Sequence, residues 1–132
     1  DGTDLSGKTP SNVIDNSFLL AASYARPLTN GADLMFDLQW SHQGQGESMP
    51  PANPITNPSY EVLNIQFGIT NGPWDFMVNL DNVMDEDYYT DLENFPNFGL
   101  DSPDFGGTGP ATIVIGTFGH PRVYSASVTY NF

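Results

Sequence analysis

Residues 122–132, RVYSASVTYNF, alternate between apolar and polar side chains as far as the last residue of the sequence. Successive side chains of an extended strand point to opposite faces. The even-numbered positions from Tyr124 to Phe132 are apolar and share one face, whereas the odd-numbered positions between them carry Ser, Thr or Asn. The pattern predicts a β-strand with one apolar face and one wettable face. A strand this strongly patterned needs other strands to pair with.

Four earlier segments show the same alternation, and we expect each of them to be a strand. They are residues 16–26, 33–41, 60–70 and 74–81. Their apolar faces carry no charged residue. Each segment is about as long as the 9–11 residues that cross a bilayer as a tilted strand. Helical spacing of apolar residues does not occur, and 13 glycines and 11 prolines interrupt the chain. The sequence therefore predicts an all-β protein.

The connections between these segments alternate in length. Residues 27–32 and 71–73 are short and rich in Gly, Pro and Asn, which are turn residues. Long loops are expected near residues 43–58 and 84–121. In an up-and-down antiparallel sheet, alternate connections lie at the same end, so one end carries turns and the other carries large loops. Within the second loop, residues 111–119 (ATIVIGTFG) are β-rich and predict an extension of a strand.

Composition excludes several classes of function. The 132 residues suit one domain, and 16 acidic against 3 basic residues give a net charge of −13. A chain this acidic has no basic patch with which to bind nucleic acid. It has no cysteine, which excludes thiol catalysis and cysteine metal sites. No nucleophile is paired with a base, so we predict no catalytic residue and no enzyme activity.

Two architectures fit this alternation. A transmembrane β-barrel has short turns at one end, long loops at the other, aromatic girdles and a lipid-facing apolar band. A soluble β-sandwich carries alternating strands as well, and a carbohydrate-binding module of that kind is the alternative. Five strands cannot close a barrel, since bacterial barrels have about eight or more. In the first architecture the chain is a fragment, a cleavage product or one chain of a split barrel.

Two stretches resemble TonB-dependent outer-membrane receptors. In residues 80–99, LDNVMDEDYYTDLENFPNFG, an Asn-apolar-x-Asp-x-x-Tyr signature ends a strand, and Asn82, Val83, Asp85, Tyr88 and Tyr89 occupy its positions. Residues 119–132, GHPRVYSASVTYNF, are similar to the final strand of that family, with a terminal aromatic residue. Residues 57–70 and 9–24 are similar to earlier strands of the same barrel end.

The resemblance implies a fold and a function. Residues 1–132 are then the C-terminal part of a 22-stranded transmembrane barrel, with about five membrane strands and with the plug domain absent. The whole receptor takes up a scarce nutrient through the outer membrane of a Gram-negative bacterium. Its partners are the rest of the barrel, the plug, the TonB complex, the bilayer and a small nutrient ligand.

The resemblance also implies that Val128, Tyr130 and Phe132 are the signal that the barrel-assembly machinery reads. Phe132 can equally be a lipid-facing girdle residue. A separated barrel piece with a structural role at the surface is a third hypothesis.

Four acidic residues of the last long loop, Asp85, Asp87, Asp91 and Glu93, occupy alternating positions. In an extended segment they share one face, about 7 Å apart. Calcium prefers oxygen clusters of this kind, so these carboxylates are candidate metal ligands and Ca²⁺ is the one cofactor considered. The alternative is a set of solvated carboxylates at a barrel rim. His42 and His120 could pair on a metal only if their loops converge.

Aromatic residues of the same loop are candidate ligand-binding residues. They are Tyr88, Tyr89, Phe95, Phe98 and Phe105. Phenylalanines interleaved with Asn, Gly and Pro suit stacking on a sugar or another planar ligand. A small cluster that folds the loop on itself is the alternative. The acidic loops disfavour an anionic ferric siderophore and favour neutral saccharides, peptides or cation-bearing ligands.

Overall fold

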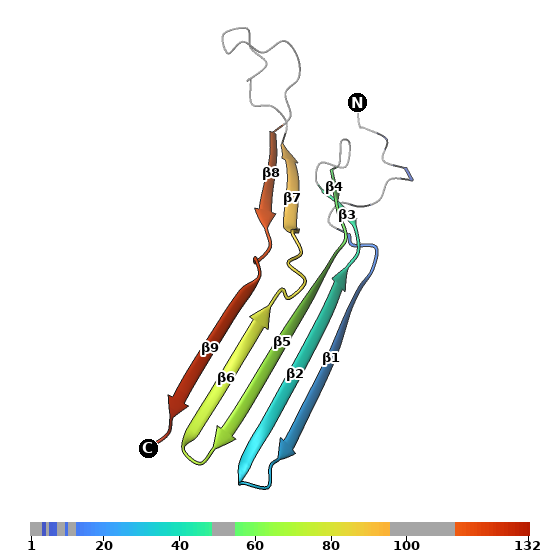
Figure 1. Cartoon of the computed structure of the whole chain (residues 1–132). Helices are drawn as coiled ribbons and strands as arrows, with labels where there is room; N and C mark the ends of the chain where they lie inside the picture. Colours follow the sequence, from blue (N-terminus) through green and yellow to red (C-terminus); the bar gives the residue numbers. More distant parts are fainter. Residues whose placement is uncertain (1–3, 5, 8–9, 11–12, 49–54, 96–112) are drawn as a thin grey trace, which may run out of the picture. The chain divides into compact units, whose positions relative to one another are not determined.

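A computed structural model describes residues 4, 6–7, 10, 13–48, 55–95 and 113–132 of the chain (Figure 1). Every regular element in these residues is a β-strand, and every strand pair is antiparallel. The chain divides into two units. The sheet unit comprises Ser17–Gln43, Tyr60–Asp87 and His120–Phe132, and the hairpin unit comprises Asp1–Asn16, Gly44–Ser59 and Tyr88–Gly119. The prediction of an all-β protein is confirmed.

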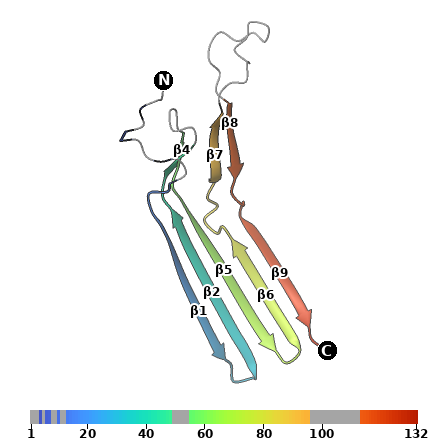
Figure 2. The ribbon, with the colours of Figure 1, turned by 180° about the vertical axis from the view of Figure 1, so that it is seen from behind.

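The sheet unit is a single five-stranded sheet (Figures 1 and 2). Its strands are β1 (Ser17–Pro27), β2 (Ala32–Gln43), β5 (Tyr60–Asn71), β6 (Trp74–Asp81) and β9 (Val123–Tyr130). Their order in the sheet is β1-β2-β5-β6-β9, which is their order along the chain. All five predicted strands and their up-and-down arrangement are therefore confirmed. The sheet is open, with β1 and β9 at its edges, and no closed barrel is formed by the described strands.

The register places the apolar positions of all five strands on one face. Leu38 of β2 is opposite Ala22 of β1 and Ile65 of β5. Phe67 and Val78 are likewise opposite each other on β5 and β6. We call this side of the sheet the apolar face and the other side the polar face. The apolar face consists of Phe18, Leu20, Ala22, Tyr24, Leu34, Phe36, Leu38, Trp40, Leu63, Ile65, Phe67, Ile69, Trp74, Phe76, Val78, Leu80, Tyr124, Ala126, Val128 and Tyr130.

The sheet unit has no hydrophobic core. Ala32 and Val62 are the buried hydrophobic residues of the described chain, and none of its large side chains is fully buried. Large residues of the apolar face, among them Leu20, Val78 and Val128, are exposed instead. A globular domain buries such side chains between two layers. Here one layer leaves them uncovered within its own unit.

Tight turns fix the register at one end of the sheet. Gly72 adopts a φ of 58° between paired Asn71 and Trp74, in the left-handed region that favours glycine. In the turn from β1 to β2, Gly31 has a φ of 80°, and the N–H of Leu28 donates to the carbonyl of Ala32 at 2.7 Å. Both short connections are thus turns, as the sequence predicts.

The hairpin unit contains two small sheets. One pairs β3 (Gly46–Glu47) with β4 (Thr56–Asn57), and the other pairs β7 (Tyr89–Phe95) with β8 (Ile113–Phe118). The predicted strand within 111–119 is confirmed as β8. Its partner β7 lies in a segment expected to be loop. Both long connections therefore contain strands, and the described residues contain no helix long and apolar enough to span a bilayer.

Candidate functional site

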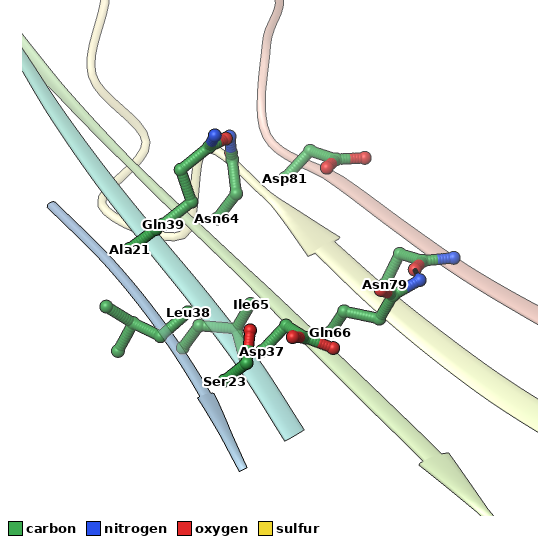
Figure 3. A pocket seen from close by; sticks show the side chains of 10 residues that line it. All are labelled: Ala21, Ser23, Asp37, Leu38, Gln39, Asn64, Ile65, Gln66, Asn79 and Asp81. Carbon is green, nitrogen blue, oxygen red and sulfur yellow. Dashed lines mark hydrogen bonds between the residues drawn. The ribbon is translucent and has the colours of Figure 1, made fainter. Parts of the chain in front are cut away.

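The polar face of the sheet unit contains an open hollow of about 390 Å³ (Figure 3). Residues of β1, β2, β5 and β6 line it, and two of them, Leu38 and Ile65, occupy apolar-face positions in the register. Two carboxylates and four amides dominate the lining, and neither lysine nor arginine is part of it. The lining residues are Ala21, Ser23, Asp37, Leu38, Gln39, Asn64, Ile65, Gln66, Asn79 and Asp81.

Hydrogen bonds between neighbouring strands orient the amides of this hollow. Gln66 Nε2 donates to Asn79 Oδ1 at 2.8 Å, and Asn79 Nδ2 donates to Ser125 Oγ at 3.3 Å. Asn64 Nδ2 donates to Gln39 Oε1 at 3.5 Å. An amide offers two donors and two acceptor lone pairs, so each amide keeps capacity for a ligand or water. With Asp37 and Asp81 alongside, the hollow suits a neutral or cationic hydrogen-bonding ligand and disfavours an anion.

The signature that ends β6 forms a turn organised by Asn82. Asn82 is 2% exposed and has a φ of 49°. Its Nδ2 donates to the carbonyls of Glu86 at 2.9 Å and His120 at 3.1 Å, and its Oδ1 accepts from the N–H of Glu86 at 3.0 Å. Its own N–H donates to Asn64 Oδ1 at 3.0 Å. The first residue of the signature therefore connects the turn to β5 and to the chain that enters β9.

Asp85 belongs to this turn and is not extended. Its φ is 58°, and its N–H donates to the carbonyl of Asn82 at 2.9 Å. Its Oδ2 lies 2.9 Å from Arg122 Nη2, and that guanidinium lies 5.8 Å from the ring centre of Tyr124. The expectation of one extended acidic face is therefore wrong at Asp85, because a left-handed residue breaks the alternation that the expectation requires.

The other three predicted metal ligands divide between the units. Asp87 ends its segment of the sheet unit, whereas Asp91 and Glu93 lie on β7. Among the residues described here, no three His, Cys, Asp or Glu side chains gather closely enough to hold a metal ion. His42 instead contacts a carboxylate, with Nδ1 3.3 Å from Glu61 Oε1.

The two predicted tyrosine sites pack at the base of the β7–β8 hairpin. The N–H of Gly119 donates to the carbonyl of Tyr88 at 2.8 Å, and a β-carbon on Gly119 would overlap the Tyr88 ring. The ring of Tyr89 lies 4.6 Å from the ring of Phe118, which is 70% exposed. Sequence reasoning missed Phe118, although the alternation in 111–119 marks it as a strand residue.

The remaining predicted ligand-binding residues are phenylalanines. Phe95 is opposite Ile113 in the β7–β8 register. Phe98 and Phe105 lie outside the described residues. The Tyr89–Phe118 pair is an aromatic contact in this hairpin, and it is a cross-strand pair of the kind that stabilises a sheet.

The residues implied as an assembly signal lie at the C-terminal end of the sheet unit. Val128 and Tyr130 belong to the apolar face and are exposed, and Phe132 is fully exposed. The Tyr130 ring lies 4.8 Å from the Trp74 ring and 5.1 Å from the Phe132 ring. These three aromatic residues form a cluster beside the turn that joins β5 to β6.

The one pKa shift found in the described part of the chain is that of Asp4. In the hairpin unit, hydrogen bonds from the side chain and the backbone of Ser6 lower the pKa of the exposed Asp4 carboxyl.

Comparisons of the chain with protein-family models, with curated proteins and with solved structures find no match.

Proposed function

We propose that the chain is the C-terminal barrel segment of a TonB-dependent outer-membrane receptor that takes up a scarce nutrient. The observation that carries the proposal is the apolar face, on which twenty uncharged side chains from five consecutive strands lie in register without a covering layer in their unit. Lipid chains would cover such a face without requiring a second layer of protein.

The polar face supports the same proposal from the other side. Its carboxylates, amides and hydroxyls suit the water-filled or plugged interior of a large barrel. Asp37 and Asp81 in the hollow favour a neutral or cationic nutrient over an anionic one. The hollow is the proposed contribution of this segment to the ligand path.

The two edge strands of the sheet need further strands to pair with. β1 and β9 each have one side without a partner strand among the described residues. Unpaired backbone groups are costly in hydrocarbon, so a membrane barrel must close. The proposal therefore assigns the missing strands of a 22-stranded barrel, the plug and the contact with the TonB complex to other parts of the receptor.

A soluble β-sandwich that binds carbohydrate is the second candidate. It would bury the apolar face beneath another sheet. The observation that favours the sandwich is the Tyr89–Phe118 pair. Phe118 is widely exposed, so the pair could serve as a stacking surface for a sugar. The large uncovered face favours the membrane proposal more strongly, since exposed apolar patches of this extent mark an interaction surface.

Single cysteines test which face meets lipid, because the chain contains none of its own. Val78→Cys and Asn79→Cys are neighbours on opposite faces of β6, and Leu38→Cys and Gln39→Cys repeat the pair on β2. Each variant of the encoded polypeptide is labelled with an environment-sensitive fluorophore in liposomes that contain a lipid-attached quencher. We expect quenching at Val78 and Leu38 and weak quenching at Asn79 and Gln39.

Equal quenching within both pairs would refute the lipid-facing assignment. Solubility of the chain at high concentration without detergent would favour the sandwich. The receptor assignment has its own test in the encoding reading frame, which we expect to contain further strands and a plug domain. A signal peptide directly before Asp1 would count against the receptor even if the face assignment holds.

A further inference from the structure

Two methionine side chains lie beside a glycine on the polar face of the sheet unit. Met35 of β2 and Met77 of β6 are both opposite Gly68 of β5. A β-carbon on Gly68 would lie 3.0 Å from Met77 Sδ and 3.4 Å from Met35 Cε. The missing side chain at Gly68 therefore leaves a space that is bordered by the sulfur of Met77 and by the methyl group of Met35.

The rows on either side of this pair in the register are polar. In the register, Asp37, Gln66 and Asn79 form the next row on one side, and Thr70 and Asp75 belong to the next row on the other. The pair borders an open hollow of about 390 Å³ whose lining also includes the polar Ser127 and Thr129 and the apolar Ile69 and Phe76. Asp75 Oδ2 in that lining accepts a hydrogen bond from Asn131 Nδ2 at 2.8 Å.

Burial does not account for the pair. Met35 is exposed, and the rows on either side of it carry carboxylates, amides and hydroxyls in place of apolar neighbours. Methionines that fill gaps in a core are surrounded by other apolar side chains. Met77 is half-buried, and a thioether pair that is only partly covered and lies between rows that carry carboxylates has the chemistry of a ligand set.

We propose that Met35 and Met77 bind a soft monovalent cation of the Cu(I) class over Gly68. Thioether sulfur selects such cations over Ca²⁺ and Mg²⁺, which take oxygen ligands. The nearby carboxylates of Asp37 and Asp75 make the local potential negative and raise the local concentration of a cation. Three strands of the sheet unit build the site, so it does not depend on the proposed membrane function.

Titration with Ag(I), a soft monovalent ion that is stable in air, tests the site directly. The 132-residue chain is labelled with ¹³C at the methionine methyl groups and kept in detergent in a chloride-free nitrate buffer. We expect the Met35 and Met77 methyl resonances to shift together and to saturate at about one Ag(I) per chain. Met84, which is exposed beyond the end of β6, is the internal control and should not shift in that range.

Leucine variants identify the ligands with little change in volume. Met35→Leu and Met77→Leu should each weaken Ag(I) binding about tenfold or more, while Met84→Leu binds as the parent chain does. Gly68→Ala keeps both thioethers but places a methyl group in tight contact with Met77 Sδ, in the space between the two side chains, and it should weaken binding as well. Strand content measured by circular dichroism confirms that each variant is folded.

Three results would overturn the proposal. The first is unchanged affinity in both Met35→Leu and Met77→Leu, which would make the pair a packing contact. The second is an equal response at Met84, which would show unspecific binding to exposed thioethers. The third is displacement of Ag(I) by millimolar Ca²⁺, which would assign the binding to carboxylates.

Discussion

Asn82 and His120 are joined by a hydrogen bond of 3.1 Å from the Asn82 side chain to the His120 carbonyl. The bond connects the turn after β6 with the chain that enters β9, 38 positions later. It explains why the signature that ends β6 begins with asparagine. The amide supplies two donors and one acceptor to this turn, and asparagine tolerates the left-handed backbone that the turn requires.

Replacing Asn82 with glycine should destabilise the sheet unit. A glycine at this position accepts the left-handed φ without strain, so the loss reports the three side-chain hydrogen bonds rather than the backbone. We expect Asn82→Gly to lower the free energy of unfolding by about 1–3 kcal/mol, measured by urea denaturation of the chain in detergent. Asn82→Asp keeps the acceptor and should show a similar loss through the two missing donor bonds. Stability equal to the parent chain in both variants would contradict the assigned role.

Replacing Gly119 with alanine should loosen the β7–β8 hairpin. The added methyl group overlaps the ring of Tyr88, which must move. Hydrogen exchange should become faster at the amides of β7 and β8 and stay unchanged in β2 and β5. In a Tyr88→Ala background the same substitution should have a much smaller additional effect, because the ring is gone. An equal effect in both backgrounds would show that the ring is not the obstacle.

A charge on the apolar face should prevent membrane insertion, whereas the same charge on the polar face should be tolerated. Val78→Arg places a guanidinium among lipid chains in the proposed orientation, at a cost of about 2–4 kcal/mol near the bilayer centre. Asn79→Arg, one residue away on the opposite face, is the matched control. The amount of folded polypeptide in the outer membrane is measured after cell fractionation. Equal amounts of the two variants would argue against a lipid-facing apolar face.

Deleting Phe132 should lower assembly in the outer membrane if the terminal aromatic residue is read as a signal. The rest of the sheet unit should be unaffected in vitro, because Phe132 is fully exposed and lies beyond the last strand. Phe132→Tyr keeps an aromatic terminus and should assemble normally. Surface levels of the encoded polypeptide are compared by antibody labelling of intact cells. Normal levels of the truncated protein would remove the signal role and leave a girdle role.

The Arg122–Asp85 ion pair should contribute little to stability. Both side chains are well exposed, at 38% and 53%, so solvent and salt screen their attraction. A double-mutant cycle with Arg122→Gln and Asp85→Asn should give a coupling of about 1 kcal/mol or less that falls further in high salt. Asparagine is the appropriate replacement because residue 85 has a positive φ. A salt-independent coupling well above this value would mean that the pair is shielded from solvent.

Period-two alternation was sufficient to locate the five strands of the sheet unit, because each has one face that excludes charge. The same signal failed for β7. Asp91 and Glu93 make that segment look like a solvated loop, and the register shift between Tyr89 and Asp91 interrupts its alternation. Its partner β8 was recognised because Ile113, Val114 and Ile115 favour a strand whatever they pair with.

The candidate sites depended on information that no single segment contains. Met35, Gly68 and Met77 lie on three different strands, and only the register of those strands brings them together. The acidic run predicts a metal site only if its backbone is extended. The left-handed residue Asp85 bends the chain where that expectation requires an extended strand.

Because the sheet unit has no close-packed interior, it should tolerate changes in the volume of its apolar side chains. With only Ala32 and Val62 buried among its apolar side chains, few positions must match the shape of a neighbour. Substitutions such as Leu38→Phe or Val128→Leu alter side-chain volume without creating a void or a clash of the kind that makes core substitutions costly. If lipid covers this face as proposed, these positions need only stay apolar and keep the alternation, and their side-chain size can vary.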